Sequence, residues 1–295
     1  MVLPDLSKYS KFADLTNGRL HYYEGGEGDK HTFLLHGGSF SVNATTFQFV
    51  FESLAEHFHI YAIDHFGHGK SSRVMEYGPT FDVVVDEMRE LMDVLGLTSV
   101  NVVGHSAGGW IGGLFAYESP DRVRKFVIVG GAGLNITPVA GVQNLKVPTV
   151  ETALRGASNS VYPGSAMTSE IAKLMAQQIV DNSGGTEGME GFRPHNDQMF
   201  NEASRKHYLL HRRLPYIKVP TMVVWGKGVH DKAGDTMEPY PTWTEEYDAV
   251  NGDIGKTSKP WVIPGAKYVL LPSTHNVHWE IPEQFTNLIV EFLNG

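Results

Sequence analysis

The segment Gly104-His-Ser106-Ala-Gly108 places a serine between two glycines in the spacing G-x-S-x-G. The apolar run Ser99–Val103 precedes it, and a run of small and apolar residues, Trp110–Tyr117, follows it. In this context the pattern is typical of a sharp strand-to-helix turn that exposes a serine hydroxyl, where a side chain on either glycine would clash. We therefore predict that Ser106 is a catalytic nucleophile rather than a surface serine in a glycine-rich loop.

A serine hydroxyl becomes a strong nucleophile when a nearby base removes its proton and a third group orients that base. His275 follows the apolar run Lys267–Leu271, at a position from which its side chain can reach over the sheet edge toward Ser106. His278 is the alternative base, but it stands close to the start of a helix. We predict His275 as the base.

An acid is expected between the nucleophile and the histidine, because this chain order is one of the known orders of such a triad. Asp231 follows the strand-like run Thr221–Trp225, and Asp235 is the competing acid. The glycine-rich loop 130–133, after the preceding strand, contains no acid. We predict Asp231 as the third member.

A developing oxyanion needs preorganised donors, which backbone amides supply. The amide of Ala107, directly after the serine, and that of Gly38, in His36-Gly37-Gly38, are the predicted donors. Residues close in sequence to these groups are predicted substrate contacts, namely Ser39, His105 and Trp279. His36 is predicted to be structural. So are four residues whose spacing suits a tight loop beneath the site: Asp64, Gly67, Gly69 and Ser71.

Strands and helices alternate in the first half of the chain, which predicts a mostly parallel sheet with helices on both faces. A hairpin over residues 11–26, with the turn Asn17-Gly18, is expected to open the fold. The predicted strands are 32–35, 60–63, 99–103, 125–129, 221–225 and 267–271. Apolar spacing near 3.6 predicts helices 46–58, 81–97, 110–117 and 282–293.

No strand is predicted between residues 135 and 217, where helices 169–180 and 196–210 are separated by loops at 184–185 and 193–194. This pattern predicts a helical cap inserted into an α/β core. The predicted domains are a first core part, 1–134, the cap, 135–218, and a second core part, 219–295. The alternative is a set of peripheral helices with no role at the site.

The 295 residues carry a formal net charge of -9 and no cysteine. Acidity gives no general attraction to nucleic acid or to an anionic membrane, and the absence of cysteine excludes disulfides and thiolate chemistry. No apolar N-terminal segment is present, so we expect a cytoplasmic protein. We expect a small-molecule substrate, no nucleic-acid or membrane partner, no cofactor and no metal, and the sequence leaves a homodimer open.

Taken together, the motifs resemble those of the α/β-hydrolase superfamily. The resemblance spans the chain except the predicted cap. This resemblance implies an α/β-hydrolase fold with an eight-stranded, mostly parallel sheet, an inserted cap, and the triad Ser106, Asp231 and His275. Branches with an aspartate nucleophile, the haloalkane dehalogenases and epoxide hydrolases, are excluded by the serine. The motifs are His36-Gly-Gly38, Asp64-x-x-Gly67-His-Gly69-x-Ser71, Gly104-x-Ser106-x-Gly108, and His275 followed by Glu280 and Pro282.

Two details of the sequence concern the branch of the superfamily that the chain resembles. The segment 275–280, with Trp279 before Glu280, is similar to the corresponding loop of hydrolases that cleave a carbon-carbon bond in ring-cleavage products. Those enzymes usually carry methionine where this chain has Ala107. The stretch between Asp231 and His275 is also longer than in relatives, which predicts an insertion over 236–261.

The main functional hypothesis is a serine hydrolase that forms an acyl-enzyme on Ser106 from a carboxylic ester or lactone. Four aromatic residues of the predicted cap favour an apolar or aromatic substrate: Phe192, Phe200, Tyr208 and Tyr216. The alternatives are hydrolysis of a carbon-carbon bond in a vinylogous diketone, which uses the same triad, and a small-molecule receptor built on the same fold.

Overall fold

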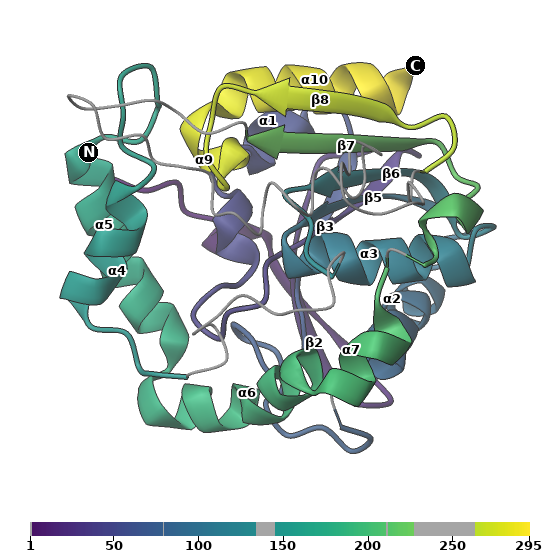
Figure 1. The fold of residues 1–295 in the computed structure, drawn as a ribbon, viewed down its shortest axis with the longest axis horizontal. Helices are drawn as coiled ribbons and strands as arrows, with labels where there is room; N and C mark the ends of the chain where they lie inside the picture. Colours follow the sequence, from purple (N-terminus) through teal and green to yellow (C-terminus); the bar gives the residue numbers. More distant parts are fainter. Residues whose placement is uncertain (1, 79, 134–144, 211, 227–262) are drawn as a thin grey trace.

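The computed structural model describes residues 2–78, 80–133, 145–210, 212–226 and 263–295 (Figure 1). These residues form an eight-stranded sheet with the order β1-β2-β4-β3-β5-β6-β7-β8. β2 pairs antiparallel with β1 and β4, and all other neighbours are parallel. The strands are Ser10–Leu15 (β1), Gly18–Gly25 (β2), His31–Leu35 (β3), His59–Asp64 (β4), Val100–His105 (β5), Val123–Val129 (β6), Thr221–Gly226 (β7) and Lys267–Leu271 (β8).

Two apolar layers cover the two faces of this sheet, because successive side chains of a strand point to opposite sides. Leu35 belongs to the layer that contains α2 (Phe81–Val94) and α3 (Ala107–Glu118). Leu34 belongs to the opposite layer, which contains α1 (Phe51–Ala55) and α10 (Pro282–Asn294). The predicted α/β fold, with its hairpin and its mostly parallel sheet, is therefore confirmed.

The single helix predicted over residues 46–58 is wrong. The chain forms a 3-10 turn, Ala44–Phe47 (η2), and then the five-residue helix α1. The Asn43 side chain caps η2 by accepting a hydrogen bond from the Thr45 amide at 2.9 Å. Threonine, phenylalanine and valine, which dominate this stretch, are weak helix formers, and burial of their side chains does not require a continuous helix.

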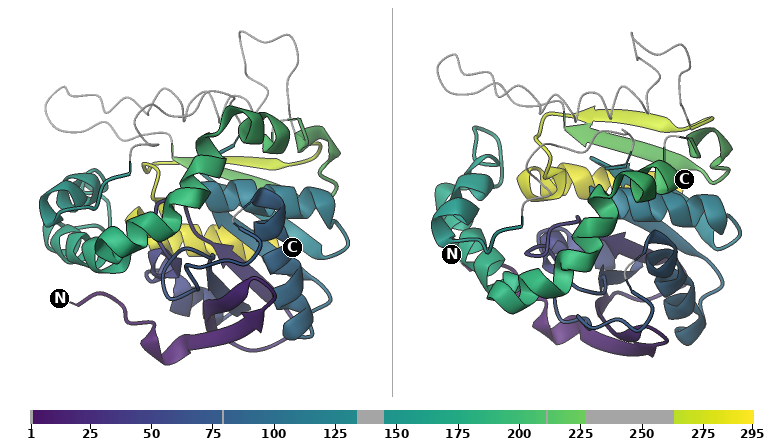
Figure 2. Two further views of the ribbon diagram at one scale, coloured as in Figure 1. Left: turned by 90° about the horizontal axis from the view of Figure 1, so that it is seen from below. Right: turned by 60° about the horizontal axis from the view of Figure 1, so that its bottom comes forward.

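Four helices lie between β6 and β7 in the described part of the chain. They are α4 (Val150–Ser158), α5 (Ser169–Ser183), α6 (Gly185–Phe200) and α7 (Glu202–Tyr208), followed by the 3-10 turn η3 (Leu214–Tyr216). α4 and α5 pack together at one side of the molecule, while α6 and α7 run along another side toward α2 (Figures 1 and 2). These inserted helices frame one end of the sheet.

Two predictions for the inserted helices are corrected. The helix expected over 196–210 is two helices, because Asn201 has an extended backbone and its side chain caps α7 through the Ser204 amide. The loop expected at 193–194 lies inside α6, which contains Pro194. Proline normally disfavours a helix interior, but Phe192 and His195 on this helix are both buried, so tertiary packing outweighs the local preference.

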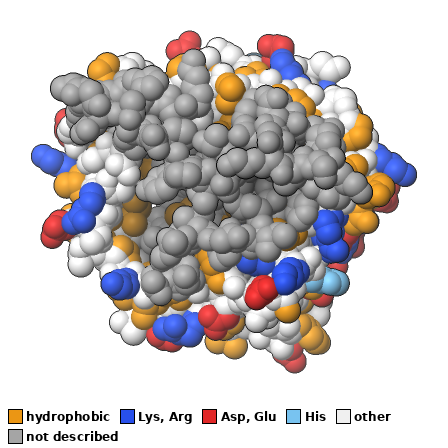
Figure 3. All heavy atoms as spheres, in the orientation of Figure 1, with side chains coloured by type: hydrophobic (Ala, Val, Ile, Leu, Met, Phe, Trp, Pro, Cys, Tyr) orange, Lys and Arg blue, Asp and Glu red, His pale blue; other side chains and the backbone are white. Residues whose placement is uncertain are grey.

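Acidic and basic side chains both occur around the margin of the face shown in Figure 3, in keeping with a surface of mixed charge. Within the described residues, no helix is long and apolar enough to cross a lipid bilayer.

Candidate active site

Ser106 lies between β5 and α3 with a backbone φ of 54° and ψ of -118°. It is the only residue other than glycine with a positive φ in the described part of the chain. Such a conformation costs about 1–3 kcal/mol and persists only when its surroundings hold it. Here the Ser106 amide donates to the Val129 carbonyl at 2.9 Å, and its own carbonyl accepts from the Ala132 amide at 2.9 Å.

The two glycines of the motif allow close approach of backbone on both sides of Ser106. A Cβ atom on Gly104 would lie 2.3 Å from the carbonyl oxygen of Gly108. A Cβ atom on Gly108 would lie 2.1 Å from the carbonyl oxygen of Leu35 in β3. The predicted clash is confirmed, and backbone packs closely on both sides of the half-buried serine.

The loop after β3 lies directly against this turn. A Cβ atom on Gly37 would be 3.7 Å from the Oγ of Ser106, and one on Gly38 would be 2.8 Å from the Cβ of Ala107. The amides predicted to bind an oxyanion, those of Gly38 and Ala107, thus belong to adjacent segments beside the nucleophile. Their role in stabilising charge stays a prediction.

His36 fixes the peptide that carries the Gly38 amide. Its Nδ1 donates to the Gly37 carbonyl at 2.7 Å, and its Nε2 accepts from the His65 amide at 3.2 Å. Because Nε2 is an acceptor, the proton is on Nδ1 and the ring is neutral; burial lowers the pKa of this imidazole. In a trans peptide the C=O and N–H groups point in opposite directions. Holding the Gly37 carbonyl toward His36 therefore turns the Gly38 N–H away from it.

A second network supports the loop after β4. The carboxylate of Asp64 is buried and accepts from the amides of Ala44 at 2.8 Å and Lys70 at 2.9 Å, and from His21 Nδ1 at 2.8 Å. A Cβ atom on Gly69 would lie 2.0 Å from an Asp64 oxygen, so this glycine lets the loop wrap around the acid. This geometry agrees with the structural role predicted for the loop.

His275 lies in the loop between β8 and the short helix α9 (Val277–Glu280). The His105 ring lies 4.5 Å from the His275 ring, centroid to centroid, and His105 Nε2 donates to the His275 carbonyl at 3.1 Å. The structure therefore brings His275 beside the residue that precedes Ser106. Burial, and then the neighbouring His105, hold the pKa of His275 well below its usual range, so the ring is neutral and able to accept a proton.

His278, the alternative base, is fully buried, and its ring lies 4.6 Å from the ring of His105, but its hydrogen bond is to another segment. Its Nε2 is hydrogen-bonded to Thr46 Oγ1 at 3.1 Å, and its ring lies 5.2 Å from that of Phe47. A histidine packed in this way has little freedom to move toward Ser106, and His275 remains the better candidate.

The three predicted substrate contacts lie in different surroundings. Ser39 is exposed, with its hydroxyl 3.2 Å from that of Ser41. His105 is buried, which lowers its pKa to about 4. The indole of Trp279 donates to the Thr46 carbonyl at 2.7 Å and packs with residues of α4 and α5, so it joins the inserted helices to the core. Contact of any of them with substrate stays a prediction.

Glu280 is a residue whose role the sequence motif did not reveal. Its buried carboxylate accepts hydrogen bonds from Ser160 Oγ at 2.7 Å, from the Tyr162 hydroxyl at 2.9 Å and from the Thr274 amide at 2.6 Å. It thereby ties the loop that carries His275 to the segment after α4. An acid five residues after the histidine was visible in the sequence, but its partners Ser160 and Tyr162 lie more than a hundred residues away.

Asp231 lies outside the described residues, as does the insertion predicted over 236–261. The acid of the triad therefore stays a prediction.

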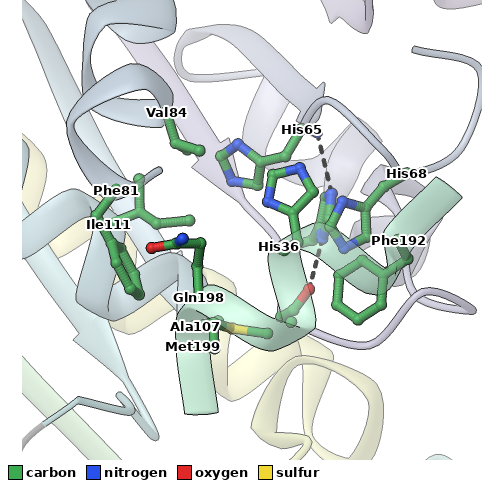
Figure 4. A pocket seen from close by; sticks show the side chains of 13 residues that line it. His36, His65, His68, Phe81, Val84, Ala107, Ile111, Phe192, Gln198 and Met199 are labelled. Atoms are coloured by element: carbon green, nitrogen blue, oxygen red, sulfur yellow. Dashed lines mark hydrogen bonds between the residues drawn. The ribbon is translucent and has the colours of Figure 1, made fainter. Parts of the chain in front are cut away.

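A cavity of about 410 Å³, part of it open to solvent, begins at the nucleophile turn (Figure 4). Gly38 and Ala107 line it next to Ser106, α2 contributes Phe81, and α6 contributes Phe192. Its lining is mostly apolar, as in small-molecule sites. The remaining lining residues are His36, Gly37, His65, His68, Val84, Ile111, His195, Gln198 and Met199.

Residues 31–163 match a family model described as the alpha/beta hydrolase fold, over the part of the chain that holds Ser106. The chain has the α/β-hydrolase fold, and the matched segment includes the nucleophile turn. It is 27% identical to a 2-hydroxy-6-oxononadienedioate/2-hydroxy-6-oxononatrienedioate hydrolase of Burkholderia vietnamiensis (strain G4 / LMG 22486), over 97% of this chain and 95% of that one. A hydrolase with the same name from Paraburkholderia xenovorans (strain LB400) is 25% identical, over 96% of this chain and 95% of that one.

Solved structures share the α/β-hydrolase fold of this chain at lower identity. A variant of the meta-cleavage product hydrolase CumD from Pseudomonas fluorescens IP01 has a TM-score of 0.72 and 21% identity, covering 96% of this chain and 97% of that one. The enol-lactonase from Burkholderia xenovorans LB400 has a TM-score of 0.67 and 22% identity, covering 97% of this chain and all of that one.

Proposed function

We propose that this protein hydrolyses a carbon-carbon bond in a vinylogous diketone, of the kind that forms when an aromatic ring is cleaved. The names of the relatives matched over nearly the whole chain support this reaction, and they favour it over the ester or lactone hydrolysis that is the main hypothesis from sequence. The structural observation that carries the proposal is the strained Ser106, which directly precedes Ala107 in the lining of an apolar cavity, while His275 lies against the ring of His105.

The reaction begins when the substrate carbonyl enters between the amides of Gly38 and Ala107. The Ser106 oxygen attacks the carbonyl carbon, the neutral ring of His275 takes the hydroxyl proton, and the two amides stabilise the negative oxygen. The bond to the neighbouring carbon then breaks. In the diketo tautomer of the substrate this neighbouring carbon is a CH2 group, so the electron pair is delocalised into a conjugated dienolate, which receives the proton held by His275 and leaves.

Water completes the cycle. His275 removes a proton from water, the resulting hydroxide attacks the acyl group on Ser106, and the carboxylic acid is released as the serine regains its proton. Asp231 is the acid proposed to orient His275 during both steps. Breaking an ester differs only in the leaving group, because an alkoxide departs in place of a dienolate, so the same residues serve either reaction.

A substrate panel tests which bond is broken. Purified protein is assayed with a 2-hydroxy-6-oxo-6-phenylhexadienoate, an aryl ester and an aromatic lactone, and products are identified by mass spectrometry. We expect the dienoate to give benzoate and a 2-hydroxydienoate with kcat/KM at least about 100-fold above that of either other compound, a preference of about 2.7 kcal/mol in the transition state. Preferential hydrolysis of the ester or the lactone would contradict the proposal and support the alternative reaction.

A further inference from the structure

The cavity beside Ser106 has two chemically different walls (Figure 4). One wall consists of apolar side chains, namely Phe81 and Val84 on α2, Ile111 on α3 and Met199 on α6. The other wall contains the imidazoles of His65, His68 and His195, each at least nine-tenths buried. These three rings take no part in the proposed hydrolysis.

Hydrogen bonds to one carbonyl fix the tautomers of two of these rings. His68 Nδ1 donates to the Phe66 carbonyl at 3.2 Å, and the His195 ring donates to the same carbonyl. The other nitrogen, Nε2, has no partner within the described residues in either ring. In a neutral imidazole with one nitrogen donating, the second nitrogen is a hydrogen-bond acceptor. The Nε2 atoms of His68 and His195 are therefore two unused acceptors.

His65 adds one further donor and one further acceptor. Neither of its ring nitrogens has a partner within the described residues. Its ring lies 6.5 Å from that of His68, and the His68 ring lies 5.7 Å from that of His195. Burial, and then nearby histidines, lower the pKa of His65 and His68 well below the usual value, and burial lowers that of His195 to about 4.

The three imidazoles thus offer three acceptors and one donor, Gln198 adds its side-chain amide, and no lysine or arginine is among the lining residues of the cavity. The described residues also contain no group of three potential ligands placed to hold a metal ion. An unpaired buried acceptor is costly, and a ligand O–H group would satisfy it. A carboxylate would bring only acceptors and a negative charge, which these lone pairs do not stabilise.

We propose that this cavity binds an uncharged portion of the substrate that carries a hydroxyl group, such as a hydroxylated ring. The hydroxyl donates to Nε2 of His68 or His195, and the carbon skeleton packs against Phe81 and Met199. This inference rests on the proposed function only in placing the reacting carbonyl at Ser106. It adds a specificity that the triad alone does not define: hydroxylated substrates are preferred over substrates with a carboxylate at that end.

Calorimetric binding of three small ketones to the intact protein tests this specificity without any turnover. The probes are 3-hydroxyacetophenone, acetophenone and 3-acetylbenzoate, which differ only in the group that would face the imidazoles. We expect 3-hydroxyacetophenone to bind about tenfold more tightly than acetophenone, as one satisfied hydrogen bond allows, and 3-acetylbenzoate to bind most weakly. Equal affinities for the first two, or tightest binding of the carboxylate, would overturn the proposal.

Variants locate the effect. The double variant His68→Phe/His195→Leu removes both proposed acceptors, keeps similar side-chain volumes and should reduce the tenfold preference to about twofold or less. His207→Leu is the matched control, because His207 is an exposed histidine on the adjacent helix α7. The preference should persist in this control. Retention of the full preference in the double variant would overturn the assignment.

The ketone series and the substrate panel fail independently. If the dienoate is not cleaved but 3-hydroxyacetophenone binds with the expected preference, the proposed reaction is wrong and the specificity of the cavity stands. If the dienoate is cleaved but the ketones show no preference, the reaction stands and the specificity is wrong.

Discussion

At the scale of single residues, the nucleophile turn concentrates backbone strain at Ser106, and hydrogen bonds from neighbouring backbone hold this conformation. Hydrogen bonds between the Ser106 backbone and the segment 129–132 hold its positive φ. Within the described part of the chain, the hydroxyl group therefore takes no part in holding the turn. The G-x-S-x-G spacing contains this information, because both glycines are needed for local clearance. The role of Glu280 is not contained in any local pattern, since Ser160 and Tyr162 meet it only in the folded chain.

His36 provides a test at this scale. His36→Ala removes the ring that holds the Gly37 carbonyl and should let the Gly38 amide turn away from the substrate oxygen. Loss of one oxyanion donor lowers kcat about 10²- to 10³-fold, and we expect KM to change less than about threefold. Steady-state kinetics with the best substrate of the panel measures both values, and circular dichroism checks the fold. A well-folded variant with wild-type kcat would show that His36 does not position this amide.

At the scale of secondary-structure elements, close contacts between β3, β5 and α3 determine where the nucleophile lies. The strands could be predicted to within about two residues, because apolar runs flanked by glycine are strong signals for buried parallel strands. The helix boundaries were less predictable. Asn201 interrupts an apolar pattern with a capping hydrogen bond, and α6 continues through Pro194 because its neighbours are buried, and neither effect can be read from periodicity.

A pair of glycine substitutions tests the packing of these elements. Gly104→Ala should lower the free energy of unfolding by about 1–3 kcal/mol or more, since its Cβ would lie 2.3 Å from backbone that cannot move freely. Gly156→Ala is the control: it lies within α4 with open space around its Cβ, and should raise the free energy of unfolding by about 0.5–1 kcal/mol. Urea denaturation measures both, and equal stabilities for the two variants would refute the packing argument.

At the scale of the whole molecule, buried imidazoles from the core and from the inserted helix α6 lie together in the lining of the cavity. The chain has 14 histidines, which the sequence showed as scattered. Folding gathers several of them around the loops that follow β3, β4 and β5. This clustering could not be predicted, because it depends on the order of the strands in the sheet and on the position of α6.

The buried histidines should make stability depend on pH. Among the described residues, eight histidines have a lowered pKa in the folded state. Six are buried, namely His36, His65, His68, His105, His195 and His278, and two are half-buried, namely His31 and His275. Below the unfolded value near 6.5, the unfolded chain binds protons that the native chain does not, so the free energy of unfolding falls as pH falls. Each such histidine contributes up to about 1.4 kcal/mol per pH unit, while the buried Glu87, whose pKa burial raises, acts in the opposite direction.

Urea denaturation at several pH values checks this dependence. We expect the free energy of unfolding to be nearly constant from about pH 7.5 to 8.5 and to fall by more than about 3 kcal/mol between pH 7.5 and 5.5. Equal stability at pH 7.5 and 5.5 would mean that these rings are protonated in the native state or are not buried.

The most direct test of the whole account is the kcat/KM of Ser106→Ala on the best substrate of the panel, compared with that of the wild type. We predict a loss of at least about 10³-fold, with unchanged urea denaturation and unchanged binding of 3-hydroxyacetophenone, because the variant removes only the attacking oxygen. Wild-type turnover by a pure, folded Ser106→Ala protein would contradict the assignment of Ser106 as the nucleophile.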